Sequence, residues 1–122
     1  MIFTMLNAGR DGVTAACRER GVKQIGNVGD WTAIAPDVFI ASAFADSGRA
    51  LFDAVADFTA GKFATGEIKR LGLETPEAVR LVMAPSVPVD IRGRIEAAAS
   101  SIVAGTLKVP VEWSGSEFPT PA

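Results

Sequence analysis

The chain has 122 residues, of which 48% are hydrophobic, and a formal net charge of −2, which are values typical of a single globular domain. It contains no histidine and one cysteine, so one chain cannot assemble a Cys/His zinc site, a Ser-His-Asp triad or a Cys-His pair. Its basic residues are scattered singly, a pattern that gives no electrostatic footprint for nucleic acid or an anionic membrane.

The first part of the chain has the pattern of a βαβ unit. Residues 2–6 form a short apolar run that predicts a buried strand. A helix is expected next, with Val13, Ala16 and Cys17 on its buried face. Residues 23–27 predict a second strand, and a strand, a helix and a strand in this order form a βαβ unit.

The rest of the chain adds further strands and two helices. Helices are predicted after the N-cap candidates Asp46 and Ser47 and after Pro88. Extended segments are predicted over residues 37–42, 66–73, 78–83 and 107–111. The second and third of these flank a proline-containing turn, which favours a β-hairpin. We therefore predict an α/β fold with a mostly parallel sheet, flanking helices and one β-hairpin.

The segment Asn7-Ala8-Gly9-Arg10-Asp11-Gly12 lies where a strand turns into a helix, which makes it the most informative stretch for function. It nearly matches the dinucleotide pattern G-x-G-x-x-G, with Asn7 in the first glycine position. Small residues here would let a ligand approach the backbone and the N–H donors of a helix start. An equally weighted alternative is that the glycines serve only a tight turn and close helix–sheet packing. The ligand-binding candidates are Asn7, Gly9, Arg10 and Asp11.

A second group of candidates follows the carboxyl ends of the next two strands, where ligands bind in parallel sheets. Asp30 and Trp31 would pair a hydrogen-bond acceptor with an aromatic ring, which suits an organic ring that carries donors. The alternative makes Trp31 an anchor at the core edge and Asp30 a turn residue. Ser42, Phe44 and Asp46 follow the third strand, although we favour helix capping for Asp46 and a core position for Phe44.

Several segments taken together resemble the C-terminal part of the basic membrane protein family. They are residues 2–12 (IFTMLNAGRDG), 25–31 (IGNVGDW), 36–42 (PDVFIAS) with Asp46, and 102–109 (IVAGTLKV). Members of this family are purine-nucleoside-receptor-like substrate-binding proteins of ABC importers with the type I periplasmic-binding-protein fold. The resemblance covers about residues 2–113.

The resemblance implies a two-lobed protein that closes on a purine nucleoside or base. Residues 1–113 would be its C-terminal portion, with 1–36 as a βαβ piece of the second lobe and 37–113 as the crossover strand and first-lobe elements. Residues 114–122 would form a flexible tail. An ABC transporter permease would be a partner, and the protein would be periplasmic or a membrane-anchored lipoprotein. Such a piece would leave apolar faces uncovered, so we expect a homo-oligomer or a complementing N-terminal portion.

The sequence start gives a different expectation for the compartment. Residues 1–6 are apolar but lack the basic region and cleavage pattern of a signal peptide. No apolar run approaches the roughly 20 residues of a membrane span. If this chain is the complete product, we therefore expect it in the cytoplasm.

These observations predict the solute-binding component of an ABC importer, in a truncated or fragment form, with a purine nucleoside or base bound between lobes. Two alternatives stay open. One is a small dinucleotide- or phosphate-binding domain that uses the turn 7–12, and the other is a ligand-free structural fragment that only oligomerises. We predict no enzymatic activity, no catalytic residue, no cofactor, no metal and no nucleic-acid partner.

Overall fold

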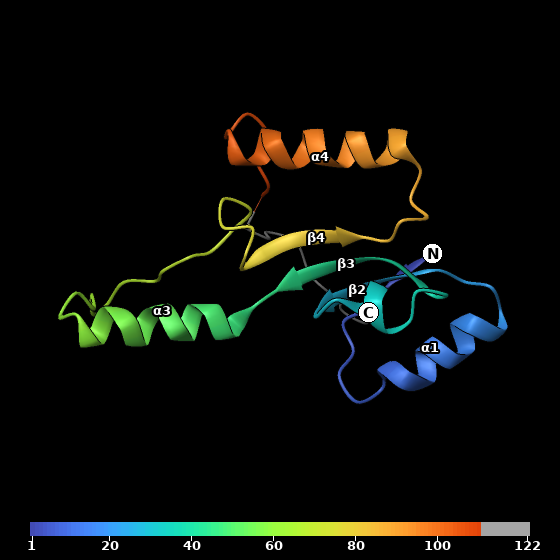
Figure 1. Cartoon of the computed structure of the whole chain (residues 1–122), viewed down its shortest axis with the longest axis horizontal. Helices are drawn as coiled ribbons and strands as arrows, with labels where there is room; N and C mark the ends of the chain where they lie inside the picture. Colours follow the sequence, from blue (N-terminus) through green and yellow to red (C-terminus); the bar gives the residue numbers. More distant parts are fainter. Residues whose placement is uncertain (111–122) are drawn as a thin grey trace, which may run out of the picture.

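The computed structural model describes residues 1–110, in which strands and helices alternate along the chain (Figure 1). The strands are β1 (Ile2–Phe3), β2 (Gln24–Val28), β3 (Phe39–Ala45) and β4 (Val79–Met83). The helices are α1 (Arg10–Glu19), α2 (Trp31–Ile34), α3 (Ser47–Thr59) and α4 (Val89–Val103). The α/β class and the βαβ unit formed by β1, α1 and β2 are therefore confirmed.

The four strands form one mixed sheet in the order β1-β2-β3-β4. β1 and β3 both run parallel to β2, whereas β4 runs antiparallel to β3, with Ala43 opposite Leu81. The predicted hairpin is wrong, because residues 66–73 form no strand and β4 pairs with β3 instead. The Gly72 N–H donates to the Glu74 carboxylate at 2.8 Å. This segment therefore ends in a local turn and not in the hydrogen-bond ladder of a sheet.

Other predicted boundaries shift at the ends of elements. β1 is shorter than the predicted strand 2–6, since Met5 and Leu6 have already left the sheet. Residues 107–110 have no regular secondary structure, and the last residue of the predicted segment 107–111 lies outside the described residues, as does the predicted tail 114–122. The short helix α2 was not predicted.

The buried core lies between α1 and the sheet. Cys17, Val38 and Phe39 form its centre, and Val13 and Trp31 are among the side chains packed against it. The predicted inner face of α1 is partly wrong, because Ala16 is exposed. Arg10, Thr14 and Cys17 are the buried residues of this helix, and their spacing of four and three places them along one face.

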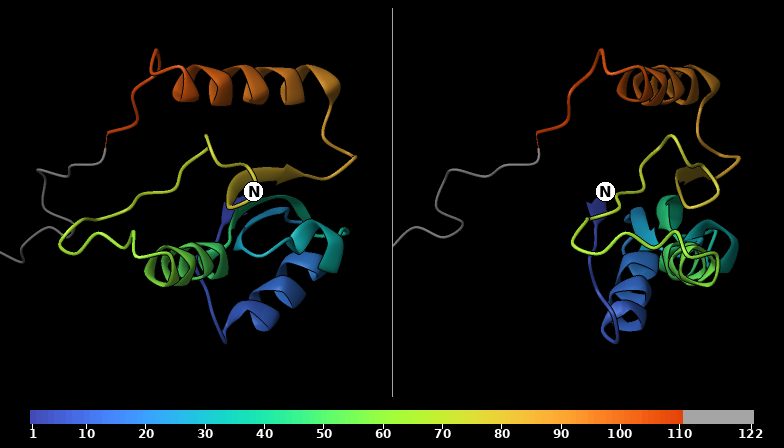
Figure 2. Two further views of the ribbon diagram at one scale, coloured as in Figure 1. Left: turned by 60° about the vertical axis from the view of Figure 1, so that its left-hand side comes forward. Right: turned by 90° about the vertical axis from the view of Figure 1, so that its left-hand side faces the viewer.

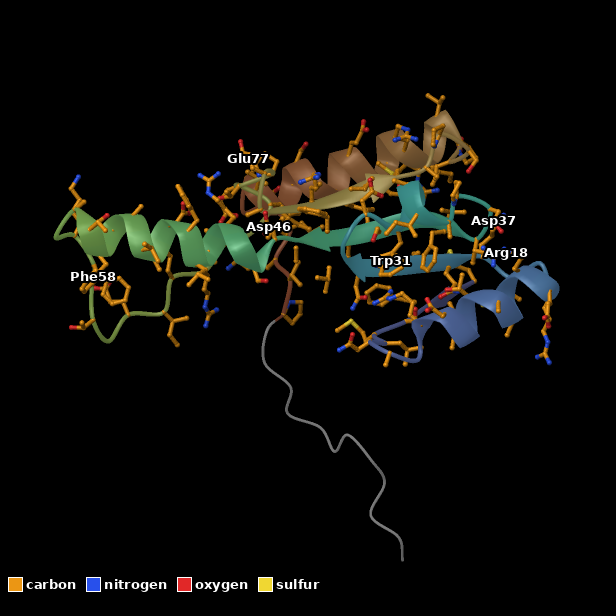
Figure 3. All side chains as sticks on the ribbon, turned by 60° about the horizontal axis from the view of Figure 1, so that its bottom comes forward. Arg18, Trp31, Asp37, Asp46, Phe58 and Glu77 are labelled. Atoms are coloured by element: carbon orange, nitrogen blue, oxygen red, sulfur yellow. The ribbon has the colours of Figure 1, made fainter. Side chains whose placement is uncertain are left out.

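An ion pair fixes the C-terminal end of α1 to the segment that enters β3. Arg18 pairs with Asp37, with 3.1 Å between Nη2 and Oδ1 (Figure 3). The hydrogen bond from Arg18 is also the main reason why the pKa of Asp37 lies below its ordinary value. Lys23 Nζ donates to the Asp37 carbonyl at 2.6 Å. The opposite end of α1, which begins at Arg10, is joined to β2 by the hydrogen bond from Arg10 to Asn27.

The helices α3 and α4 leave large apolar faces uncovered. α3 extends away from the sheet (Figures 1 and 3), and its Phe52 and Phe58 are 69% and 72% exposed. α4 stands apart from the sheet in both views of Figure 2. α4 lies beyond β4, across a cavity of about 700 Å³ that is lined mainly by apolar side chains such as Leu81 and Ile102. Within residues 1–110, no helix is both long and apolar enough to cross a membrane.

Candidate functional site

A pocket of about 650 Å³ opens at the carboxyl ends of β1 and β2. Three segments build its wall, namely residues 5–7, the first residues of α1 at 10–11, and the segment 27–31 apart from Asp30. Ligands of open α/β sheets bind at this end of the strands. The wall combines apolar side chains with a few polar groups, as small-molecule sites commonly do.

Arg10 is the most distinctive residue of this pocket because its side chain is charged and yet only 7% of the residue is exposed. Its Nη2 donates to the Leu6 carbonyl and to Asn27 Oδ1, both at 2.6 Å. The guanidinium carbon lies 4.2 Å from the centroid of the Trp31 ring, which is cation–π geometry. The arginine is therefore held by neutral acceptors and one aromatic face.

Asn27 connects the three segments of the wall. Its Oδ1 accepts from Arg10, and its Nδ2 lies 2.8 Å from the Met5 sulfur. Its backbone carbonyl accepts from Trp31 Nε1 and from the Gly29 N–H, each at 2.9 Å. Sequence reasoning missed both Asn27 and Met5. The available signal was an amide at the end of a predicted strand, since such a group requires partners when it is buried.

Trp31 joins the pocket to the core. Its ring is tilted against Phe39, with 5.7 Å between the centroids, and lies on the side of β2 that faces α1 (Figure 3). Gly26 approaches it so closely that an added Cβ would lie 2.6 Å from Trp31 Cδ1. Because Arg10 already stacks on the indole, Trp31 positions this arginine rather than offering that face to a ligand.

Val28, also in the pocket wall, has a backbone conformation that is rare for its residue type. Its φ is +68°, and the Gly29 N–H bonds back to the Asn27 carbonyl, so residues 27–29 form a γ-turn. A β-branched residue at positive φ is strained by about 1–3 kcal/mol. This strain lies directly beside the buried polar groups of the pocket.

We expect Val28→Gly to stabilise the fold by about 1 kcal/mol. The relieved strain exceeds the entropy cost of glycine, and Val28 is mostly exposed, so little apolar burial is lost. Urea denaturation followed by circular dichroism measures the difference. Val79→Gly is the matched control, since Val79 lies in β4 without a positive φ and its replacement should destabilise. Equal losses in the two variants would contradict the strain.

Asp30 serves as the N-cap of α2. Its Oδ1 accepts from the Thr32 N–H at 3.0 Å, the Thr32 hydroxyl at 2.5 Å and the Ala33 N–H at 3.3 Å. The hydroxyl bond is the main reason why the pKa of Asp30 is lowered, and the backbone bonds and Arg80 act in the same direction against partial burial. These contacts direct the carboxylate to the helix start.

Replacing this cap should give a pH-dependent loss of stability. A carboxyl whose pKa is lower in the folded state stabilises the fold above its unfolded pKa of about 3.9, and this contribution is lost as the pH falls through the folded value. We expect Asp30→Ala to cost about 1 kcal/mol at pH 7 and clearly less below pH 3. Asp30→Asn keeps the acceptor and should remain close to the unchanged chain. A deficit of Asp30→Ala that is equal at both pH values would contradict this role.

The structure separates the nine candidate residues into two groups. Those that meet at the pocket are Asn7, Arg10, Asp11 and Trp31. The other five do not line the pocket, and they are Gly9, Asp30, Ser42, Phe44 and Asp46.

Three residues of this second group make contacts within the fold. Ser42 is fully buried and donates to the Gly29 carbonyl at 2.6 Å, Phe44 lies under Arg80, and Asp46 caps α3. Gly9 has no positive φ and nothing within 4 Å of an added Cβ, so neither a tight turn nor close packing requires a glycine there.

One other feature of the described residues could be mistaken for a site. The cavity between β4 and α4 is slightly larger than the pocket, but its wall is mainly apolar and none of the side-chain N or O atoms found buried without a partner belongs to it. Among residues 1–110, no group of three or more acidic or cysteine side chains is placed to hold a metal ion. The pocket around Arg10 is therefore the better candidate.

Comparison with known proteins gives a likeness of fold. No family model matches the chain, and no curated protein matches it. The structure is similar to the crystal structure of a transcriptional activator of the comK gene from Bacillus halodurans, with a TM-score of 0.75 and 19% sequence identity. The match covers 87% of this chain and 38% of that chain. At this identity the likeness concerns the fold, and this chain spans well under half of the activator's length.

The likeness to a transcriptional activator corrects the function predicted from sequence. The match is to a transcriptional activator and not to a transporter component, so the assignment to the basic membrane protein family and the role as a solute-binding component of an ABC importer are wrong. Neither the dinucleotide or phosphate alternative nor the ligand-free fragment gains support. Asp30 and Asp46, two of the residues that suggested the family, both cap helices.

Proposed function

We propose that this chain is a small-molecule-binding module of a regulatory protein. The observation that carries the proposal is the pocket of about 650 Å³ around Arg10, a buried cation held in place by Asn27 and Trp31. Buried and mutually bonded polar groups of this kind are characteristic of binding sites. The likeness of fold to a transcriptional activator supports the regulatory part.

The construction of the pocket suggests how a ligand would act. The segment between β1 and α1, the first turn of α1 and the turn after β2 are linked through the side chains of Arg10 and Asn27. A ligand bound among them would favour one arrangement of these segments over others. Ligand binding would thereby change the surface that the module presents to other parts of the regulatory protein.

Intrinsic fluorescence tests the proposal because the chain has two tryptophans and no tyrosine. In a Trp113→Phe variant, Trp31 is the only source of tryptophan emission. We expect at least one planar compound from a panel of benzoate, benzamide, uracil and adenine to change this emission saturably and to raise the Tm. The matched control is N-acetyltryptophanamide titrated with the same compounds, whose emission should show no saturable change. The absence of any saturable change with all four compounds would contradict the proposal.

We further propose that the isolated chain associates with a second copy, since α3 and α4 expose apolar faces. Light scattering should give a mass of at least twice 12.7 kDa. Phe58→Glu, in the exposed face of α3, should lower that mass, whereas Lys62→Glu, just after the helix, should not. A monomeric mass with cooperative unfolding would contradict association.

A further inference from the structure

We infer that the ligand of the Arg10 pocket carries a carboxylate, which binds the guanidinium of Arg10. The inference rests on the proposed function and adds the chemical class of the ligand. It follows from the charge balance of the pocket and from the hydrogen bonds that Arg10 leaves unmade.

The positive charge of Arg10 has no negative partner in the part of the chain that the structure describes. The ion pairs found there are Arg18–Asp37, Arg49–Asp53 and Lys69–Asp57. Arginine is seldom this deeply buried without a partner, because removing a charge from water costs free energy that only an opposite charge and full hydrogen bonding offset. The acceptors that Arg10 does have are a carbonyl and an amide, both neutral.

The donors of Arg10 are also incompletely used. Nη2 makes both of the observed hydrogen bonds, whereas Nη1 is buried without a partner. The guanidinium presents its N–H groups as a planar fork that matches a carboxylate. A ligand carboxylate would therefore supply the missing acceptor and the missing charge together.

Access to Nη1 requires a side chain of the wall to move, since this atom is closed off from solvent. Met5 in this wall is unbranched, 74% exposed and joined to the site through its contact with Asn27, so it can change rotamer without loss of core packing. Leu6 and Val28 complete an apolar wall for the body of the ligand.

Asp11, the other charged residue of the pocket wall, limits how much negative charge the ligand can carry. Asp11 lines the same pocket, and a second negative charge on the ligand would be repelled by it. A monocarboxylate is thus favoured over a phosphate monoester, which carries nearly two charges at neutral pH.

The test compares matched ligands that differ in this one group. The Trp113→Phe variant is titrated with benzoate and with benzamide, at constant ionic strength, and then with inorganic phosphate. We expect the Kd for benzoate to be at least about tenfold lower than the Kd for benzamide, which is the usual gain from a charge-assisted hydrogen bond. Phosphate should have little effect.

Two variants then identify the group responsible. Asn27→Asp is nearly isosteric and gives Arg10 an internal carboxylate, so the Kd values for benzoate and benzamide should become similar. Arg10→Gln should likewise abolish the preference for benzoate, and circular dichroism checks that each variant is folded. A preference that survives in both variants would overturn the inference.

The remaining outcomes separate this inference from the proposed function. Equal affinities for benzoate and benzamide would overturn the carboxylate and leave a small-molecule site intact. Binding of phosphate as tight as that of benzoate would show general anion attraction and would also overturn it. If neither ring compound binds, and uracil and adenine fail as well, both proposals are contradicted.

Discussion

Replacing Gly26 by alanine should destabilise the fold by about 3 kcal/mol, the upper end of the cost of overpacking. The added Cβ would lie 2.6 Å and 2.8 Å from two atoms of the Trp31 ring and 2.9 Å from the Ser42 hydroxyl oxygen. Real Cβ contacts are not this short, so the indole has to move. Its movement would also remove the aromatic support of Arg10.

Gly12→Ala is the matched control for this prediction. Gly12 lies within α1, has no positive φ and has nothing within 4 Å of an added Cβ. Alanine is favoured over glycine inside a helix by about 0.5–1 kcal/mol, so this variant should be slightly more stable than the unchanged chain. Urea denaturation of both variants gives the comparison. Similar effects of the two substitutions would contradict the close approach at Gly26.

Trp31→Ala should cost about 3–5 kcal/mol, as large aromatic truncations usually do. The ring packs against Phe39, stacks on Arg10 and donates through Nε1 to the Asn27 carbonyl. All three contacts vanish in this variant, and Arg10 becomes a buried cation with still fewer partners. Trp31→Phe keeps an aromatic ring without the N–H donor, so its free energy of unfolding should fall clearly less than that of Trp31→Ala.

The two substitutions should also be strongly coupled. In a Trp31→Ala background, Gly26→Ala no longer meets the indole, so most of its cost should disappear. A double-mutant cycle measures this coupling, and residues in direct contact typically give 0.5–3 kcal/mol. Additive costs would show that Gly26 and Trp31 act independently, contrary to the geometry.

The elements that could be predicted from sequence are those fixed by local patterns. The βαβ unit, the helix capped by Asp46 and the helix after Pro88 each depend on neighbouring residues, and the structure contains all three. The pairing of β4 with β3 could not be predicted, because the strands are far apart in the sequence and the proline turn offered a nearer partner. The cap at Asp30 also resembled a ligand contact, since both uses need a carboxylate after a strand.

In the candidate site, too, the sequence predicted what local patterns determine and missed what distant contacts determine. A strand followed by a helix with small residues indicated the neighbourhood of Asn7, Arg10 and Asp11, and these residues do line the pocket. The contacts of Asn27 with Arg10 and Met5 span 17 and 22 positions, so no local pattern reports them. Burial of a charged residue in the first turn of α1 likewise depends on the tertiary structure.

The central claim is that small molecules bind at the carboxyl ends of β1 and β2. A ¹H–¹⁵N correlation spectrum recorded during titration with benzoate tests it most directly. We predict saturable shifts for the backbone of Asn27 and Gly29 and for the indole N–H of Trp31, while signals around the β4–α4 cavity, such as those of Leu81 and Ile102, stay in place. Unchanged signals at residues 27–31, or shifts confined to the β4–α4 cavity, would contradict the claim.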